Sequence, residues 1–391
     1  MQKANTGSST NADSYLAGRE AATKAKVGLG GIKMAFVYAG ADNDMDRVLQ
    51  GIREELPGVP LIGNTSFTGV ITPEGFISGE RGFVALLALA DPELCVGIAS
   101  LPKGGCARST GAEVARQAMR AAGRNEAPDY FHLVAPPGEE EFFLKGISDV
   151  VGRIPFFGGS AADNAIAGQW KVFSESGAHA DGVAVAFFYT RAAMANHFTG
   201  AYRETADMAI ITKVDGHRRL IEIDGVPALT KYAQWLGTDA AALKGMALLV
   251  ATITSPLGVK DRLGELVAIR HPMYGHDDGS MDIGNKLAVG TTVIRMETTV
   301  DELIASTGDA LKRVKEKLAA PAGAFHLVHC GGRRAGIGER IDEVVERLKR
   351  EAGDTPFICE FTFGEYGYED DGNNTCGGLM LSFTALAKTT A

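Results

Sequence analysis

The chain alternates between short apolar runs and stretches in which apolar residues recur at helical spacing. Three of the apolar runs indicate buried strands: KMAFVYA at Lys33–Ala39, YFHLVA at Tyr130–Ala135 and FHLVHC at Phe325–Cys330. An amphipathic stretch follows each of them, as in Asp44–Leu56, where the apolar residues share one helical face. A proline then opens another apolar run, and a hairpin follows it. The pattern predicts the order strand, helix, strand, hairpin, repeated three times.

The spacing of prolines and glycines supports three copies of one unit. From the proline that opens the second strand to the glycine before the closing strand, the offsets are 22, 27 and 22 residues (Pro60 to Gly82, Pro155 to Gly182 and Pro356 to Gly378). Near-constant spacing of this kind is typical of repeated structure. We therefore expect an α/β fold with a two-domain, mixed-sheet architecture, built from repeated strand–helix–strand–hairpin units and covered by helices.

The units divide the chain into three expected segments. Residues 1–30 are predicted to be an N-terminal extension, loose up to residue 12 and followed by a short helix from Asp13. Residues 31–195 contain two of the units and form the first α/β domain. Residues 196–391 form the second domain, in which other strands and short helices precede the third unit.

Composition excludes some classes of function. With 39 basic and 48 acidic residues the net charge is −9, which argues against binding nucleic acid through its phosphates. The five cysteines show no CxxC spacing and are expected to be reduced thiols. No apolar run approaches the ~18–20 residues of a membrane span, and the N-terminus lacks the apolar core of a signal peptide. We expect a soluble, cytoplasmic protein with no membrane insertion.

The turn GGRRAGIGER, which follows the third unit's first strand, is the strongest candidate for ligand binding. Its glycines let the backbone approach a ligand, and the start of a helix favours an anion. Arg333 or Arg334 would clamp a carboxylate, and Cys330 lies at the strand end just before the turn. The alternative is a tight turn with two solvated arginines.

Three loops occupy equivalent places after the prolines: GNTSFTG (Gly63–Gly69), GGSAADN (Gly158–Asn164) and TFGEYG (Thr362–Gly367). Asp163 and Glu365 in these loops are acceptors suited to an ammonium group, so the loops and the arginine turn together suit an amino acid. The alternative is that such residues only form turns. The predicted ligand-binding set is Ser66, Ser160, Asp163, Asn164, Cys330, Arg333, Arg334, Glu365, Asn374 and Thr375.

Recognisable catalytic motifs are missing from the sequence. His329 and Cys330 are neighbours in a strand and point to opposite faces, so the histidine is a poor base for the thiol. Ser160 lacks the second glycine of a nucleophile elbow. A non-enzyme is therefore expected, although Cys330 or the carboxylates Asp163 and Glu365 leave an uncharacterised enzyme open as an alternative.

The eight histidines include no HExxH or other paired metal spacing, so no metal site is predicted. His132 and His326 fall at matching positions of two units, which indicates a shared structural role. Four other histidines lie in or near expected loops, and one of them could be a haem ligand: His179, His197, His271 and His276. No cofactor is expected, with haem as the alternative.

Six motifs in this order resemble one family. They are MAFVYAG, VPLIGNTSFTG and IPFFGGSAADN in the first domain, and IEIDGVPALTKYAQWLG, HCGGRRAGIGER and FTFGEYGYEDDGNNT in the second. Over roughly residues 30–388 the chain resembles the FIST sensory domains, N-terminal and C-terminal parts together. The resemblance implies an intracellular signal-input protein that binds small ligands, with amino acids as the proposed class. Some relatives are described as haem-binding nitric-oxide sensors.

Residues and resemblance together favour a stand-alone small-ligand sensor. We expect an amino acid or a related carboxylate to bind near the interface of the two domains. No kinase, cyclase or chemotaxis module flanks these domains, so the output is expected to pass through a downstream signalling protein. The alternatives are a haem-binding nitric-oxide sensor, an uncharacterised enzyme and a protein-interaction module.

Overall fold

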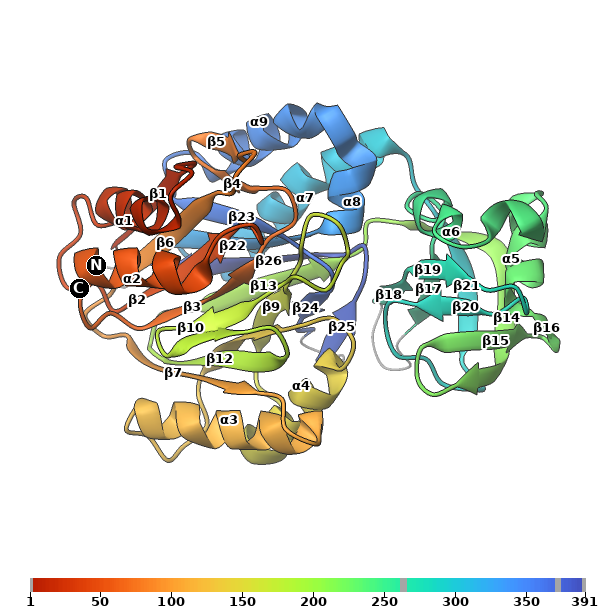
Figure 1. Cartoon of the computed structure of the whole chain (residues 1–391), viewed down its shortest axis with the longest axis horizontal. Helices are drawn as coiled ribbons and strands as arrows, with labels where there is room; N and C mark the ends of the chain where they lie inside the picture. Colours follow the sequence, from red (N-terminus) through yellow and green to blue (C-terminus); the bar gives the residue numbers. More distant parts are fainter. Residues whose placement is uncertain (1–2, 261–265, 370–373, 389–391) are drawn as a thin grey trace.

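The computed structural model describes residues 3–260, 266–369 and 374–388. Three six-stranded sheets with their covering helices form a main body, and an eight-stranded sheet is inserted at one end of it (Figure 1). The inserted sheet comprises residues 203–297 and is drawn in green; the rest of the described chain is the main body. The predicted mixed α/β fold with repeated units is confirmed.

Each unit of the main body contributes an edge strand, a helix, two parallel strands around a second helix, a hairpin and a closing strand. The first unit consists of β1 (Lys3–Ser9), α1 (Ser14–Ala25), β2 (Met34–Ala39), α2 (Met45–Glu55), β3 (Leu61–Thr65), β4 (Val70–Thr72), β5 (Gly75–Ile77) and β6 (Val84–Ala90). The second consists of β7 (Cys95–Pro102), α3 (Ala107–Ala121), β8 (Tyr130–Ala135), α4 (Glu140–Val151), β9 (Phe156–Ser160), β10 (Val172–Ser174), β11 (Gly177–His179) and β12 (Gly182–Tyr189).

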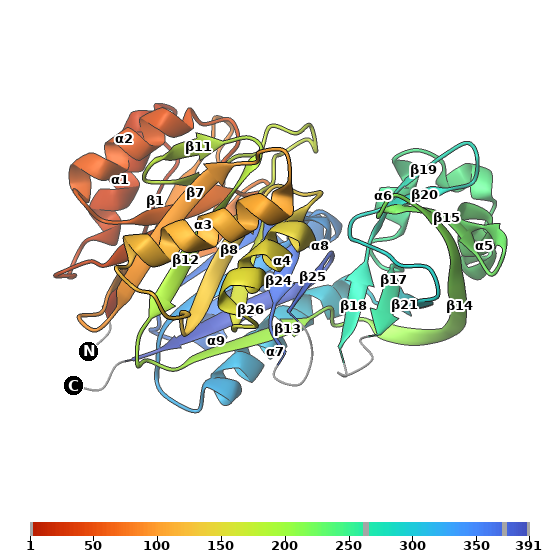
Figure 2. The same ribbon diagram turned by 90° about the horizontal axis from the view of Figure 1, so that it is seen from below.

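The third unit is interrupted by the inserted sheet. It consists of β13 (Met194–Thr199), α7 (Val300–Leu318), β22 (Ala322–Cys330), α8 (Gly331–Ile337), α9 (Ile341–Ala352), β23 (Phe357–Thr362), β24 (Glu365–Gly367), β25 (Thr375–Gly377) and β26 (Leu381–Ala387). The insertion contains β14 (Arg203–Asp215), β15 (Arg219–Ile223), β16 (Val226–Pro227), α5 (Ala228–Leu236), α6 (Ala247–Ala251), β17 (Leu257–Lys260), β18 (Val267–Arg270), β19 (Pro272–Gly275), β20 (Met281–Ile283) and β21 (Thr292–Glu297). Figure 2 shows this sheet at one end of the main body, joined to it through β14 and through the start of α7.

The three units exchange their hairpins. Each sheet is centred on a parallel pair, which is β2 with β3, β8 with β9 or β22 with β23. The hairpin β10–β11 of the second unit extends the first sheet beside β3, β24–β25 of the third extends the second sheet beside β9, and β4–β5 of the first extends the third sheet beside β23. The units are therefore linked in a closed ring of three sheets.

Helices cover the outer face of each sheet, and the inner faces meet in one core. The pairs α1 with α2, α3 with α4 and α7 with α9 pack on the three outer faces. The inner faces contribute to a shared apolar cluster that includes Phe36, Phe157, Phe188 and Leu386. None of the helices in the described part of the chain is long and apolar enough to cross a membrane.

The N-terminal segment differs from the expectation of a loose extension. Residues Lys3–Ser9 form β1, which pairs along its length with β6. The segment is a polar edge strand, exposed at Lys3 and buried from Gly7 to Ser9, and polar edge strands carry little apolar signal. Gly7 lets α1 approach closely, because a Cβ there would lie 2.2 Å from the Ala21 carbonyl oxygen. The expected helix is confirmed as α1, with Asp13 accepting a hydrogen bond from Leu16 N.

The expected boundary near residue 195 lies inside β13, which pairs with the last strand, β26. β13 is the edge strand of the third unit, as β1 is of the first unit and β7 of the second. The inserted sheet therefore interrupts the third unit after its first strand. The division at residues 31–195 and 196–391 stays a prediction about sequence domains, while in space the exchanged hairpins tie the two parts together.

Candidate functional site

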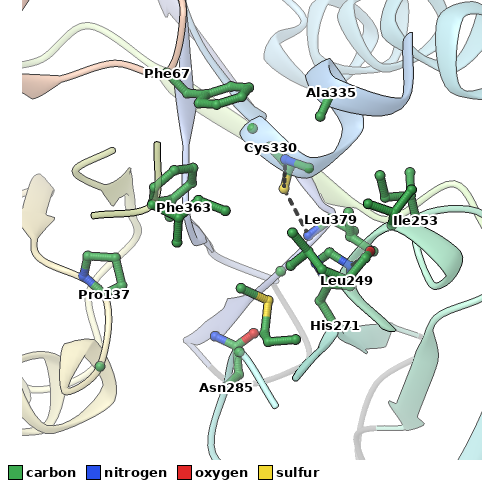
Figure 3. A pocket seen from close by; sticks show the side chains of 18 of the residues that line it. Phe67, Pro137, Leu249, Ile253, His271, Asn285, Cys330, Ala335, Phe363 and Leu379 are labelled. Atoms are coloured by element: carbon green, nitrogen blue, oxygen red, sulfur yellow. Dashed lines mark hydrogen bonds between the residues drawn. The ribbon is translucent and has the colours of Figure 1, made fainter. Parts of the chain in front are cut away.

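A cavity of about 330 Å³ lies between the main body and the inserted sheet (Figure 3). We call it the interface cavity. Its main-body wall lies where the parallel strands of all three sheets end, since Phe67 follows β3, Pro137 follows β8 and Phe363 follows β23. Carboxyl ends of parallel strands are the usual ligand-binding edge of α/β sheets. The repeated body thus supplies one half of the site.

Apolar side chains form most of the wall. From the main body come Phe67, Pro137, Ile166, Trp170, Ala335, Phe363 and Leu379; from the insertion come Leu249, Val250, Ile253 and Met273. The volume is at the lower end of the range for small-molecule sites, and a mainly apolar lining with few polar groups is typical of them. The cavity therefore suits a compact ligand with an apolar body.

Asn285 is the polar group that stands out in this wall. It follows β20 in the insertion, the residue is 1% exposed, and both its amide nitrogen and its amide oxygen lack a hydrogen-bond partner within the described chain. An unpaired buried polar group costs about 1–3 kcal/mol. A ligand that both accepts and donates a hydrogen bond would remove that cost at this residue.

His271 also lines the interface cavity. Its Nε2 is 3.0 Å from the Leu249 carbonyl oxygen, and burial lowers the pKa of the imidazole to about 4. The other histidines considered for haem, His179, His197 and His276, do not line this cavity. His271 offers the type of ligand that haem iron takes, but its Nε2 is engaged with Leu249, so ligation through that atom requires this contact to break.

A group of charges beside the cavity joins the insertion to the main body. Arg218 of the insertion contacts Glu141 Oε2 at 2.6 Å and Glu140 Oε2 at 2.9 Å, both carboxylates being in the first turn of α4. Glu141 also accepts a hydrogen bond from Lys286 N at 2.9 Å. Burial raises the pKa of Glu140 to about 7, the charge of Glu141 adds to the shift, and Arg218 opposes it. These contacts fix one edge of the cavity.

Cys330 is the one member of the predicted ligand-binding set that lines the interface cavity. Its Sγ accepts hydrogen bonds from Gly332 N and Leu379 N, each at 3.2 Å (Figure 3). Burial nevertheless raises the pKa of the thiol well above its ordinary value. Because a protonated thiol is a weak nucleophile, the side chain acts here as part of the wall.

The expected arginine clamp is not formed in this structure. The sequence predicted a turn at GGRRAGIG, but residues Gly331–Ile337 form α8, capped by Cys330. The helix directs Arg333 against α7, where it is fully buried and donates to Gly200 O at 2.6 Å and to Ser306 Oγ at 2.6 Å. Arg334 donates to Gly338 O at 2.9 Å. Neither guanidinium lines the interface cavity.

The two predicted ammonium acceptors also have partners within the protein. Asp163 accepts hydrogen bonds from the backbone of Ala165, Ala167 and Gln169, and so shapes the loop that carries Trp170 into the cavity wall. Glu365 is fully buried and accepts from Met380 N at 2.8 Å and Thr362 Oγ1 at 2.9 Å. Burial raises the pKa of Glu365 to about 8.

The remaining predicted residues are dispersed. Ser66 Oγ bonds to Gly69 O, Ser160 to the Tyr366 hydroxyl, Asn164 to Thr68 N and Asp42, Asn374 to Ile154 O and Thr375 to Cys376 O. The loops GNTSFTG and TFGEYG nevertheless reach the cavity, through Phe67 and Phe363. The prediction named the polar residues of these loops, but the aromatic residues of the same loops form the cavity wall. The prediction missed Arg218 and Asn285, which belong to the insertion and have no counterpart in the repeats.

Comparisons with known proteins match most of the chain to two family models. The FIST N domain matches residues 33–226 and the FIST C domain matches residues 228–368. No curated protein matches the sequence. Among solved structures the chain is similar to cyanuric acid hydrolase from A. caulinodans (12% identity, TM-score 0.38, 99% of this chain and 100% of that one). It is also similar to phosphoribosylformylglycinamidine synthase II from Thermotoga maritima (11% identity, TM-score 0.25, 99% and 72%). Because both TM-scores are below 0.5, these similarities carry no argument about the activity of this chain.

Proposed function

Because this chain belongs to the FIST family of sensory domains, we propose that it binds a small ligand in the interface cavity. The observation that carries the proposal is Asn285, a buried amide with both polar atoms unpartnered in an otherwise apolar wall. A pocket of this kind recognises an apolar body by its walls and a polar head by the amide.

The ligand class that we propose is an apolar or aromatic amino acid, or a related small carboxylate. The Asn285 nitrogen would donate to the carboxylate, and its oxygen would accept from the ammonium group. Phe67, Trp170 and Phe363 provide aromatic surface for the side chain of the ligand. This assignment keeps the amino-acid class expected from the sequence but moves recognition from Arg333 and Asp163 to Asn285.

Signalling would follow from the position of the cavity. A ligand there contacts the main body and the insertion together, so it stabilises the arrangement in which the two are closed on each other. We propose that a partner protein distinguishes this arrangement from a looser one. The protonated Cys330 thiol supports binding without turnover of the ligand.

The test is a thermal-shift and calorimetric panel of the twenty amino acids and their 2-oxo acids on the purified full chain. A ligand at about 100 times its Kd should raise the melting temperature by about 3 °C. Asn285→Leu should weaken binding by about 10- to 100-fold, because the polar head loses its partner. Asn164→Leu is the matched control, since that amide lies outside the cavity, and it should bind like the wild type. Equal loss in both variants, or no binding of any compound, would contradict the proposal.

A haem-based sensor is the second candidate, because an imidazole, that of His271, lies in the cavity wall. Haem is larger than a compact ligand, so its binding would require the cavity to widen. Haem would supply an iron centre for a gaseous ligand. Titration with haemin should then give a Soret band that is lost in His271→Ala and retained in His276→Ala. Absence of a band in the wild type would exclude this candidate.

A further inference from the structure

The centre of the main body contains polar side chains in an otherwise apolar core. The strand registers place Phe36 of β2, His132 of β8 and His326 of β22 at equivalent positions of the three units. Their rings meet where the inner faces of the three sheets converge, with centroid separations of 5.1 Å (Phe36 to His132), 4.6 Å (Phe36 to His326) and 4.9 Å (His132 to His326). Two of three equivalent core positions are therefore histidine where the first unit has phenylalanine.

A neighbouring layer adds a carboxylate. Glu360 of β23 and Asn64 of β3 are equivalent by register, both are fully buried, and Asn64 Nδ2 donates to Glu360 Oε2 at 2.7 Å. Within the described residues several atoms of this cluster have no partner: both ring nitrogens of His132, Nδ1 of His326, Oε1 of Glu360 and Oδ1 of Asn64. Each such atom costs about 1–3 kcal/mol in a dry core, so the cluster is expensive unless something else binds there.

The ligand atoms of His132, His326 and Glu360 all lie within 4.8 Å of one another. We propose that these three side chains hold a divalent transition-metal ion at the centre of the main body. Two imidazoles with a carboxylate are a set that zinc accepts, and neutral imidazole is the form that binds. When an ion is bound tetrahedrally with bonds of about 2.0–2.1 Å, its ligand atoms lie roughly 3.3 Å from one another. Each distance between two of the three ligand atoms would therefore shorten by roughly 1.5 Å at most on binding.

Other side chains are arranged as a second layer around these ligands. The Tyr38 hydroxyl is hydrogen-bonded to His326 Nε2, and the same nitrogen lies 3.9 Å from the unpartnered Glu360 Oε1, so Tyr38 would give up this contact when the ion binds. Asn64 holds one carboxylate oxygen of Glu360 and leaves the other unpartnered. Hydrogen bonds of this kind orient metal ligands in proteins. All three units thus contribute, the first through Tyr38 and Asn64, the second through His132 and the third through His326 and Glu360.

The role of this ion would be structural. The site is enclosed by Phe36, Phe157 and the fully buried strands, so metal binding there would add to the free energy of folding. Three protein ligands leave a fourth position, which a trapped water would fill. Because His132, His326 and Glu360 are fully buried, we expect the ion to be bound during folding. This proposal is independent of the ligand proposed for the interface cavity.

The experiment is refolding of the full chain with Zn²⁺, with Co²⁺ or with a chelator, followed by dialysis and elemental analysis. We expect about one Zn²⁺ or Co²⁺ per chain, a melting temperature at least 5 °C higher than that of the chelated protein, and a visible Co²⁺ spectrum typical of tetrahedral nitrogen and oxygen ligands. His132→Phe, which copies the residue of the first unit, and Glu360→Gln should each reduce the metal content at least tenfold.

His329→Gln is the matched control, because His329 is equally buried but packs against Phe361 outside the cluster. It should retain the metal. Less than a tenth of an ion in the refolded wild type would overturn the proposal, as would equal metal content in wild type, His132→Phe and Glu360→Gln. If a variant does not fold, the Co²⁺ spectrum of the wild type decides, since an octahedral spectrum or none contradicts the site.

Discussion

The main body and the inserted sheet are built on different principles. In the main body, central strands such as β2, β8 and β12 are buried along their whole length, because helices cover one face and the other sheets cover the second. In the inserted sheet β14 alternates between buried and exposed positions, and Met208 is 58% exposed. From this difference in burial we infer that stability is concentrated in the repeated body, while the insertion contributes the polar side chain Asn285 to the interface cavity.

The largest expected effect comes from glycine positions that differ between the two regions. A Cβ at Gly63 would lie 1.7 Å from the Val37 carbonyl oxygen in the first sheet, so Gly63→Ala forces two backbones apart. We expect it to reduce the free energy of unfolding by about 3 kcal/mol or more. Gly216 in the insertion has φ of +59° and open space around it, so Gly216→Ala should cost only about 1 kcal/mol. Urea denaturation measures both, and equal losses would contradict the comparison.

The pH dependence of stability should come next in size. Burial raises the pKa of Glu365 in the folded protein to about 8, above its value of about 4.3 in an unfolded chain. Between these values the folded state holds a proton that the unfolded state has released, so stability is lost as pH rises through the folded pKa. We expect a loss of about 2 kcal/mol between pH 6.5 and 8.

Glu365→Gln should remove the part of the pH-dependent loss of stability that comes from Glu365, because the amide does not titrate. Denaturation at pH 6.5, 7.25 and 8 measures it. Glu140, whose pKa is about 7, acts in the same direction, so some slope should remain. A variant with an unchanged slope would show that Glu365 is ionised in the folded protein at neutral pH.

The smallest effect is expected where the insertion returns to the main body. Thr299 caps α7, accepting from Glu302 N at 3.2 Å while Glu302 Oε2 accepts from Thr299 N at 2.8 Å. Thr299→Ala should cost about 1 kcal/mol and increase amide exchange in the first turn of α7. A loss above about 2 kcal/mol would mean that this junction is part of the core of the body and not a connection to it.

The order of elements within each unit could be predicted from the sequence because it depends on local patterns. Runs such as FHLVHC and the regular proline-to-glycine offsets identify strands and units without knowledge of the fold. The exchange of hairpins could not be predicted, because no local pattern in the sequence of β4–β5 indicates that it pairs with β23 of another unit. The strand β1 could not be recognised from an apolar run, because it is an edge strand and its residues are polar.

The candidate site was harder to predict, because its parts are distant in sequence. Arg333 is a charged residue in a glycine-rich stretch and looks solvated, yet α7 supplies the carbonyl and hydroxyl oxygens that allow it to be buried. Asn285 lies in an insertion without repeats, so no spacing distinguished it. The matching positions of His132 and His326 did show in the sequence, but Glu360 joins them only through the parallel pairing of β22 with β23.

The central claim is that the main body and the insertion share one ligand. Hydrogen–deuterium exchange on the full chain, with and without saturating L-phenylalanine or L-leucine, tests it most directly. We expect protection on both sides of the interface cavity, around Phe67 and Phe363 in the body and around Leu249 and Asn285 in the insertion, and loss of this protection in Asn285→Leu. Protection confined to the body near Asp163, or unchanged exchange in the insertion, would contradict it.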